Sequence, residues 1–206
     1  MEIVAVILAA GASTRMGRPK MLLPFGDSTV IETVVGNVTA SQVAHTVVVL
    51  GYEWTKIYAL IEHLPVEVIV NPRPERGMIS SVQWALAQMN QSVDGVLFAL
   101  GDQPLIPTSV HDTVIDAFRY HPNSIIVPTY EGKRGHPVLF SSCFREEILG
   151  LPTDRGLNTL LHLHPSAVHE VPVDTDAVLH QMNTLEEYQQ MLQRLSKTSP
   201  HTVADG

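Results

Sequence analysis

The chain has 206 residues, a length that fits one domain with a sizeable core and requires no disulfide or metal to stabilise it. Hydrophobic residues make up 45% and charged residues 17%, which excludes a disordered, collagen-like or coiled-coil protein. The net charge of −8 argues against a general nucleic-acid binder, because phosphate contacts need a basic face.

The apolar run over residues 3–10 is too short to cross a bilayer, and it follows Glu2 rather than a basic segment. We therefore expect neither a membrane partner nor a signal peptide. The single cysteine, Cys143, cannot form an internal disulfide, which fits a reducing compartment, and we expect it to be a small buried hydrophobe in a helix. Together these features predict a cytoplasmic protein.

Short apolar runs rich in β-branched residues recur along the first part of the chain, as expected of strands that are covered on both faces of a parallel sheet. They occupy residues 3–8, 46–50, 66–70, 96–100 and 124–127. Segments with helical spacing lie between them. Thr29 and Glu32 have the spacing of a capping box that opens the first helix. Val82, Leu86 and Met89 share one face of a later helix.

This alternation predicts an α/β fold with one open, mostly parallel sheet and helices on both of its faces. After Pro128 the pattern loosens into a short strand at 137–140, a loop and short helix over 154–164, and a strand at 168–173. Thr184 and Glu187 then have capping-box spacing before a last helix. Its expected apolar face carries Leu185, Tyr188, Leu192 and Leu195. We expect one domain over residues 1–196 and a polar tail over residues 197–206.

The loop after the first strand combines small residues with concentrated positive charge. It reads LAAGASTRMGRPK over residues 8–20 and carries Arg15, Arg18 and Lys20. Ligands of open α/β sheets bind beyond the carboxyl ends of the strands, where backbone N–H groups of small residues can approach phosphates closely. The spacing is neither a Walker A loop nor G-x-G-x-x-G. The composition indicates a polyphosphate site, and a surface loop with solvated charges is the alternative.

The same loop resembles the signature L-A-A-G-x-x-x-R-M-G-x-x-K of nucleotidyltransferases that activate small phosphorylated compounds with a nucleoside triphosphate. The resemblance implies a Rossmann-like nucleotidyltransferase fold in which the loop wraps the triphosphate and Arg15 and Lys20 contact its phosphates. The loop residues that it assigns to nucleotide binding are Leu8, Ala9, Ala10, Gly11, Arg15 and Lys20.

Asp102 follows the fourth apolar run, in the sequence Gly101-Asp102-Gln103-Pro104. A carboxylate there can hold Mg²⁺, although a turn residue is the ordinary interpretation of an Asp in such a sequence. The stretch is similar to the G-D-Q-P of the branch that handles the molybdenum cofactor, which implies that Asp102 is a metal ligand. Many relatives have a second metal-binding aspartate where this chain has Asn183. An amide oxygen can still coordinate Mg²⁺, but we expect weaker metal binding because one negative charge is missing.

The segment NPRPERGMISS over residues 71–81 could be a proline-rich turn with a serine helix cap. It is also similar to the G-M-x-x-S of molybdenum cofactor cytidylyltransferases, which implies that Gly77, Ser80 and Ser81 lie at the nucleobase. The related guanylyltransferases carry a more glycine-rich segment here, so the resemblance favours cytosine over guanine.

Residues 134–137 are similar to the R-G-H-P of the same branch, which implies that His136 and Pro137 lie near the acceptor substrate; a structural or surface histidine is the alternative. Residues 153–161 match the family only in part. Leu157 and Asn158 replace its Ala-Arg, so a guanidinium suited to gripping a phosphate is missing there. Acceptor recognition is therefore the least secure of these assignments.

The ten histidines lack the spacings of structural zinc sites, so we do not expect zinc. Trp54 and Trp84 fit helix faces and predict core packing rather than base stacking.

The resemblance extends from Val4 to about Tyr188. It implies an Mg²⁺-dependent enzyme that transfers CMP from CTP to the phosphate of molybdenum cofactor (molybdopterin) and releases pyrophosphate. Arg15, Lys20 and Asp102 would be its catalytic residues, and an apo molybdenum hydroxylase a transient partner. The attacking phosphate is already an anion, so no general base is required. A guanylyltransferase, a sugar- or alcohol-phosphate nucleotidyltransferase, and a non-catalytic carrier of the cofactor remain as alternatives.

Overall fold

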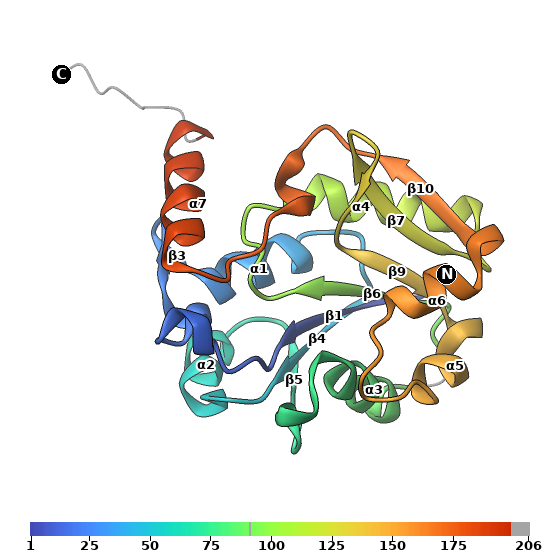
Figure 1. Ribbon diagram of the computed structural model, residues 1–206, viewed down its shortest axis with the longest axis horizontal. Helices are drawn as coiled ribbons and strands as arrows, with labels where there is room; N and C mark the ends of the chain where they lie inside the picture. The colour runs from blue at the N-terminus through green and yellow to red at the C-terminus, as the bar shows by residue number, and fades with distance from the viewer. Residues whose placement is uncertain (91, 199–206) are drawn as a thin grey trace.

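A mixed β-sheet forms the centre of the computed structural model, which describes residues 1–90 and 92–198 (Figure 1). Its strand order is β10-β7-β9-β6-β1-β4-β5, and the short β8 pairs with β7. The strands are β1 (Ile3–Ala9), β4 (His45–Leu50), β5 (Glu67–Val70), β6 (Gly95–Leu100), β7 (Ile125–Tyr130), β8 (Lys133–Arg134), β9 (Val138–Ser141) and β10 (Val168–Pro172). A separate hairpin pairs β2 (Pro24–Phe25) with β3 (Ser28–Thr29). The predicted α/β class and mostly parallel sheet are confirmed.

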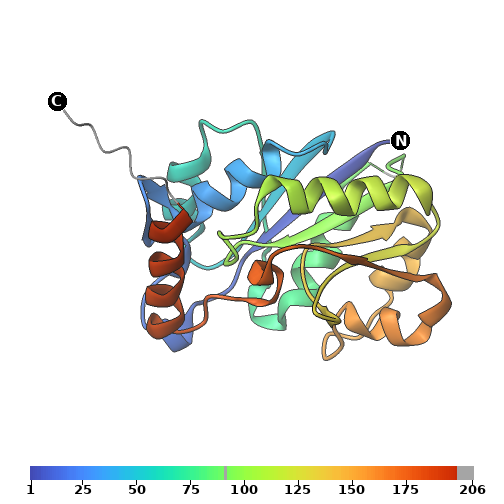
Figure 2. The same cartoon turned by 90° about the horizontal axis from the view of Figure 1, so that it is seen from above.

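Helices cover both faces of the sheet, as predicted (Figure 2). The helices are α1 (Val30–Thr39), α2 (Trp54–Ile61), α3 (Met78–Gln88), α4 (Thr108–Tyr120), α5 (Arg145–Leu149), α6 (Asn158–Leu163) and α7 (Leu185–Thr198). Helices α1, α2 and α4 pack on one face of the sheet, and α3, α5 and α6 pack on the other. Single-turn 3₁₀ helices occur at several loops, two of them in the loop after β1.

Strand β1 shows why the apolar runs are continuous rather than alternating. Ile3, Ala5 and Ile7 belong to the core on one face of the sheet, whereas Val4 and Val6 belong to the core on the other. The strand also lies between β4 and β6, both parallel to it. Every residue of β1 must therefore be apolar, because both of its faces are covered by helices.

The second half of the sheet departs from parallel order at a single strand of the main path. Strand β9 pairs antiparallel with both β6 and β7. Strand β10 runs parallel to β7 at the edge of the sheet. Strands β7 and β8 form a hairpin through Glu131 and Gly132, both with positive φ. After this hairpin the chain enters β9, whose Val138 pairs with Phe98 of β6.

Helix α7 packs outside the sheet, on the β2–β3 hairpin (Figure 1). Tyr188, Leu192 and Leu195 contact a cluster around Phe25 and Met182. The Tyr188 hydroxyl also donates to the Pro24 carbonyl over 2.6 Å. The predicted apolar face is correct at these three leucine and tyrosine positions and wrong at Leu185, which is 42% exposed.

Both predicted capping boxes are present. The Thr29 hydroxyl accepts from the Glu32 N–H at the start of α1, and the Glu32 carboxylate accepts from the Thr29 N–H. The Glu187 carboxylate accepts from the Thr184 N–H, and the Glu187 N–H donates to the Thr184 hydroxyl. Helix α7 runs to Thr198, two residues into the predicted tail, and residues 199–206 of that tail lie outside the described residues.

Two predictions of burial are wrong. Cys143 is exposed in the 3₁₀ turn Ser142–Phe144, where the neighbouring Phe144 fills the core position instead. Trp54 is 44% exposed, because Ile57 and Ile61 form the buried side of α2. Within residues 1–90 and 92–198, no helix has both the length and the apolar character needed to cross a membrane.

Candidate functional site

The carboxyl ends of β1, β4, β5 and β6 meet at one edge of the sheet, because these strands are parallel neighbours. The loops that follow them enclose a cavity of about 450 Å³. It is lined by Leu8, Ala10, Gly11, Ala12, Arg15, Lys20, Met21, Tyr52, Pro74, Glu75, Gly77, Met78, Ser81, Leu100, Asp102, Gln181 and Asn183. The predicted triphosphate loop, metal ligands and nucleobase segment thus contribute to one cavity.

The loop after β1 folds into two 3₁₀ turns, Thr14–Met16 and Lys20–Leu22. Ser13 (φ 54°) and Gly17 (φ 64°) have left-handed backbone conformations on either side of the first turn. The Ser13 hydroxyl accepts from the Lys20 N–H over 3.1 Å, which closes the loop. These bends return the chain to the cavity, so that Arg15 and Lys20 both line it.

Gly51, at the end of β4, lets this loop pack closely against the loop that follows β5. A Cβ at position 51 would lie 2.7 Å from the Ala10 carbonyl oxygen and 2.8 Å from the Pro74 Cβ. Neither neighbour can tolerate such a distance without moving. The absence of a side chain here therefore sets the spacing between the loops that follow β1 and β5.

Lys20 and Asp102 form the central ion pair of the cavity. The Lys20 ammonium donates to the Asp102 carboxylate and, over 3.0 Å, to the Met182 carbonyl. The two side chains are only 13% and 11% exposed. A lysine that is partly desolvated and aimed at a glycine-lined cavity can bind a phosphate with little reorganisation, because its position is already fixed.

Arg15 contacts the segment before α7 rather than Asp102. Its Nη2 donates to the Asn183 Oδ1 over 2.9 Å. The Asn183 N–H donates in turn to the Glu187 carboxylate over 2.7 Å. The two candidate metal ligands, Asp102 and Asn183, therefore each accept a hydrogen bond from a cationic side chain of the same loop.

The donor set at Asp102 and Asn183 fits Mg²⁺. No group of three or more His, Cys, Asp or Glu placed to hold a metal ion occurs in the described ranges 1–90 and 92–198. Mg²⁺ is usually held by only one or two carboxylates together with substrate phosphates and water. One carboxylate and one amide oxygen on the same cavity suit that arrangement, with phosphates completing the coordination.

The segment over residues 71–81, predicted to lie at the nucleobase, is ordered by Asn71 and by Gly77. Gly77 precedes α3 with φ 87° and ψ 176°, a conformation that side chains strongly disfavour. Asn71 is buried and donates to the hydroxyls of Ser80 and Ser81. Of the predicted nucleobase residues, Gly77 and Ser81 line the cavity, whereas the Ser80 hydroxyl donates to the Gly77 carbonyl. Among the predicted loop residues, Ala9 is fully buried in the sheet and does not line the cavity.

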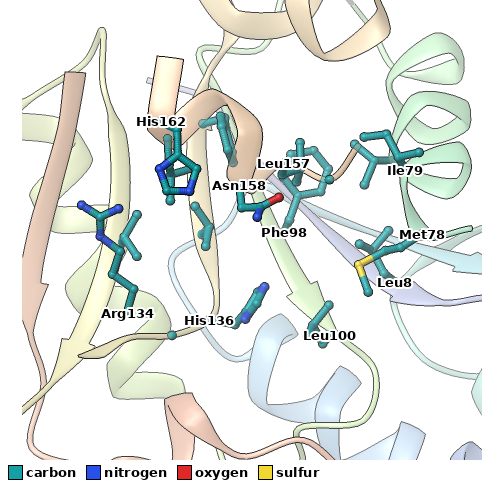
Figure 3. A pocket seen from close by; sticks show the side chains of 17 residues that line it. Leu8, Met78, Ile79, Phe98, Leu100, Arg134, His136, Leu157, Asn158 and His162 are labelled. Carbon is teal, nitrogen blue, oxygen red and sulfur yellow. The ribbon is translucent and has the colours of Figure 1, made fainter. Parts of the chain in front are cut away.

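A second cavity of about 430 Å³ adjoins the first and shares Leu8, Met78 and Leu100 with it (Figure 3). Its walls are mainly apolar side chains of β6, β7, β9, α3 and α6. Figure 3 shows His136 projecting into it between Arg134 and Leu100. Pro137 is not part of the wall, although its neighbours His136 and Val138 are. The remaining polar side chains on the wall are Arg134, Asn158 and His162.

His136 is half-buried at the wall of this cavity. Burial lowers the pKa of its imidazole, and the nearby Asp102 carboxylate opposes that effect. The backbone approaches closely beside it, because a Cβ at Gly135 would lie 2.4 Å from the Val178 carbonyl oxygen.

Several residues of the two cavities were not predicted from the sequence. Tyr52, Gln181 and the Met182 carbonyl lie at the first cavity or bind Lys20, and Phe98 and Val127 form walls of the second. Tyr52 follows the end of β4, so its position after a parallel strand was an available signal. Phe98 and Val127 belong to apolar runs, in which nothing distinguishes a cavity wall from core.

The family model of the MobA-like NTP transferase domain matches residues 5–171. The chain belongs to this family. The predicted resemblance to nucleotidyltransferases, including molybdenum cofactor enzymes, is thereby confirmed. The matched range begins within β1 and ends within β10, so it contains both cavities except for the segment after β10 that carries Gln181 and Asn183.

Relatives of the family differ in their named activities. The chain is 26% identical over 199 residues to nicotine blue oxidoreductase of Paenarthrobacter nicotinovorans, covering 92% of this chain and 96% of that protein. It is 28% identical over 149 residues to molybdenum cofactor cytidylyltransferase of Escherichia coli (strain K12), covering 69% of this chain and 72% of that protein.

Solved structures similar to this chain include Rv0371c from Mycobacterium tuberculosis H37Rv. That structure has a TM-score of 0.85 and 30% sequence identity, covering 94% of this chain and 98% of the other. A crystal structure of Rv0371c in complex with manganese has a TM-score of 0.80 and 28% sequence identity, covering 94% of this chain and 99% of the other. The nucleotidyltransferase fold therefore extends over nearly the whole chain.

Proposed function

We propose that this nucleotidyltransferase transfers CMP from CTP to the terminal phosphate of molybdenum cofactor and releases pyrophosphate. The observation that carries the proposal is the position of Lys20 and Asp102. They come from loops 82 positions apart, form an ion pair in one cavity, and lie beside a second, mainly apolar cavity. Because relatives with different named activities share the family, the proposal rests on the residues of this chain.

The two cavities suit two substrates of different chemistry. The first cavity has the small-residue loop and the cations that a triphosphate requires. The second has the size and apolar walls of a site for a flat heterocycle, with a few polar side chains to orient it. Their shared border at Leu8, Met78 and Leu100 supports a geometry in which the two reacting phosphates meet between the cavities.

In the proposed reaction a phosphate oxygen of the cofactor attacks the α-phosphorus of CTP. A new P–O bond forms as the bond breaks between the α-phosphorus and the oxygen that bridges it to the β-phosphorus, and pyrophosphate leaves. Lys20 and Arg15 would balance the negative charge that develops on the α-phosphate and the leaving group. The protein supplies alignment of two polyanions, for which no proton-abstracting group is needed.

Asp102 and Asn183 would hold Mg²⁺ at the same phosphates. When bound, the cation supplies charge neutralisation and orients the phosphate oxygens. The manganese complex of Rv0371c supports a divalent cation in this fold. Lys20 and Arg15, which occupy the two oxygen ligands in this structure, are then free to contact phosphate oxygens.

Cytosine is the proposed base because Gly77, Met78 and Ser81 match the cytidylyltransferase pattern and all three line the first cavity. Among these three residues, Ser81 is the one with a polar side chain. Recognition of the base by the Ser81 hydroxyl, rather than by the backbone of a glycine-rich segment, supports CTP over GTP as the substrate.

The test is a pyrophosphate-release assay with CTP, GTP and ATP, each with and without molybdenum cofactor and Mg²⁺. The proposal expects release that requires CTP, the cofactor and Mg²⁺ together. Release with GTP would identify a guanylyltransferase instead. Release with a sugar phosphate or an alcohol phosphate as acceptor would replace the proposed substrate of the second cavity.

A carrier that delivers the cofactor to an apo molybdenum hydroxylase is a second candidate. It is favoured by Asn183, which leaves the metal site with a single carboxylate, and by the partial match of residues 153–161. A carrier would bind the cofactor without any Mg²⁺-dependent release of pyrophosphate. The same assay, combined with a measurement of cofactor binding, therefore separates the two functions.

A further inference from the structure

Asn71 is a buried polar residue that stands behind the nucleobase side of the first cavity. It follows β5 directly and is 3% exposed. Its backbone N–H donates to the Leu50 carbonyl over 2.8 Å, which fixes the residue between the ends of β4 and β5. A side-chain amide at such a depth must find partners for its donors and its acceptor.

The orientation of the Asn71 amide follows from its neighbours. The Oδ1 atom accepts from the Arg73 backbone N–H over 2.9 Å. A backbone N–H can only donate, so the oxygen must be on this side and the Nδ2 on the other. Nδ2 then donates its two hydrogens to the hydroxyl oxygens of Ser80, over 2.9 Å, and Ser81, over 3.0 Å.

The two serines use their own hydroxyl hydrogens differently. Ser80 donates to the Gly77 carbonyl over 2.7 Å, so its hydroxyl is satisfied within the segment. Ser81 accepts from Asn71, but its own hydrogen has no acceptor among residues 1–90 and 92–198. Ser81 is only 3% exposed, and it lines the cavity. Its O–H is therefore available to a ligand as a hydrogen-bond donor.

We infer that Asn71 is a positioning residue that acts through Ser81 to present a hydrogen-bond donor to the nucleobase. By occupying a lone pair of the Ser81 oxygen, Asn71 turns the hydrogen of that hydroxyl toward the cavity. Such a donor selects a base edge that carries acceptors. Cytosine has two adjacent acceptors, N3 and O2, on its edge. This inference rests on the proposed function only in that the bound nucleotide is CTP.

The substitution Asn71→Asp reverses this polarity with almost no change in shape. One carboxylate oxygen can still accept from the Arg73 N–H, while the other now accepts from the serines instead of donating to them. The Ser81 hydrogen then turns to the carboxylate, and only oxygen lone pairs face the cavity. A base acceptor at that position would be repelled rather than bound.

The experiment measures dissociation constants by calorimetry for CTP and for inorganic tripolyphosphate, which has the phosphates and no base. We expect Asn71→Asp to weaken CTP binding by about tenfold or more. One hydrogen bond to the base is lost, and an acceptor atom of the base then faces the lone pairs of the Ser81 oxygen. Binding of tripolyphosphate should stay within about twofold of wild type. A role confined to holding the fold together would weaken both ligands equally, and that result would overturn the inference.

Ser81→Ala provides a second, smaller change that keeps the test decisive if the aspartate variant does not fold. It should weaken CTP binding to a similar extent and leave tripolyphosphate binding unchanged. Because Asn71 is inferred to act through Ser81, adding Asn71→Asp to Ser81→Ala should produce little further loss. Unchanged CTP binding in Ser81→Ala, or fully additive losses in the double variant, would each contradict the inference.

Asn37→Asp is a matched control for replacing a partly buried amide by a carboxylate. The Asn37 Nδ2 donates to the carbonyls of Pro104 and Ile106, away from the cavity. We expect it to lower the unfolding temperature and leave the CTP dissociation constant unchanged. An equal loss of CTP affinity in this control would count against a specific role for Asn71. Wild-type protein that binds CTP but releases no pyrophosphate would refute the proposed transfer and leave this test intact.

Discussion

Arg15 and Asn183 are 168 positions apart, yet the Arg15 guanidinium donates to the Asn183 side-chain oxygen over 2.9 Å. The contact joins the loop after β1 to the segment just before α7, whose capping residue Glu187 holds the Asn183 backbone. It also pairs a candidate phosphate-binding cation with a candidate metal ligand. Transfer of Arg15 to a phosphate would free the amide oxygen for Mg²⁺, so we expect nucleotide and metal to bind cooperatively.

Asn183→Asp tests the metal side of this relationship. The substitution restores a negative charge next to the proposed cation site, and we expect the Mg²⁺ concentration for half-maximal pyrophosphate release to fall by about fivefold. The measurement is a Mg²⁺ titration of activity at saturating CTP. An unchanged Mg²⁺ requirement would remove Asn183 from the metal site. Asn90→Asp adds the same charge at an exposed position and should leave the titration unaltered.

Lys20→Ala should lower turnover by about two to three orders of magnitude. Removing one charged contact to a transition state typically costs ~3 to 4 kcal/mol in activation free energy. The variant also leaves the Asp102 carboxylate without its ammonium partner, so folding should be checked by thermal unfolding. The measurement is kcat at saturating CTP and cofactor. Lys56, paired with Glu53 on the surface of α2, provides the control, and Lys56→Ala should keep wild-type turnover.

The parts of the fold that the sequence predicts are those set by local pattern. Runs such as 3–8 and 96–100 indicate doubly covered strands, and the capping boxes at Thr29 and Thr184 depend on residues three positions apart. The antiparallel direction of β9 has no such local signal, since three apolar residues followed by a serine could form a strand of either direction. The exposure of Trp54 and Cys143 likewise has no local signal. It depends on which side of a short helix or turn the rest of the protein covers.

The site residues also divide into those that the local sequence pattern predicts and those that depend on contacts between distant segments. Parallel strands bring their carboxyl ends together, so residues that follow those strands, such as Lys20 and Asp102, were expected to share a cavity. Asn183 was included only by resemblance, because it reaches the cavity from a segment that follows the edge strand β10. The role of Asn71 could not be predicted from the sequence, because it depends on which hydroxyl lacks a partner once the chain is folded.

Acid should destabilise the protein through His111. This imidazole is buried in α4, and burial lowers its pKa to about 4, while Nδ1 lies 3.1 Å from the Pro107 carbonyl. The folded state binds this proton less tightly than the unfolded state, whose pKa is about 6.5. His111 therefore adds no pH dependence to the free energy of unfolding above pH 6.5, and its titration lowers that free energy by up to about 1.4 kcal/mol per pH unit between pH 6.5 and 4.

Denaturant unfolding of wild type and His111→Gln across this pH range measures the effect. The variant should be less stable at neutral pH and should lose stability less steeply on acidification. Parallel curves for the two proteins would show that another group causes the acid sensitivity. The exposed His45, on β4, supplies the control, and His45→Gln should follow wild type.

Gly51→Ala should damage nucleotide binding more than its size suggests. The added methyl group would lie 2.7 Å from the Ala10 carbonyl oxygen and 2.8 Å from the Pro74 Cβ, so the loops on either side of the first cavity must separate. We expect CTP affinity to fall about tenfold or more, together with a loss of about 1 to 3 kcal/mol in the free energy of unfolding.

The same substitution at Gly36 separates this steric effect from the general effect of replacing glycine. Gly36 is exposed within α1, and a Cβ there would meet no atom within 4 Å. Gly36→Ala should therefore raise the free energy of unfolding by about 0.5 to 1 kcal/mol, because alanine favours the helix, and leave CTP binding unchanged. Equal CTP affinity in Gly51→Ala and Gly36→Ala would mean that the contact between the loops after β1 and β5 does not shape the nucleotide site.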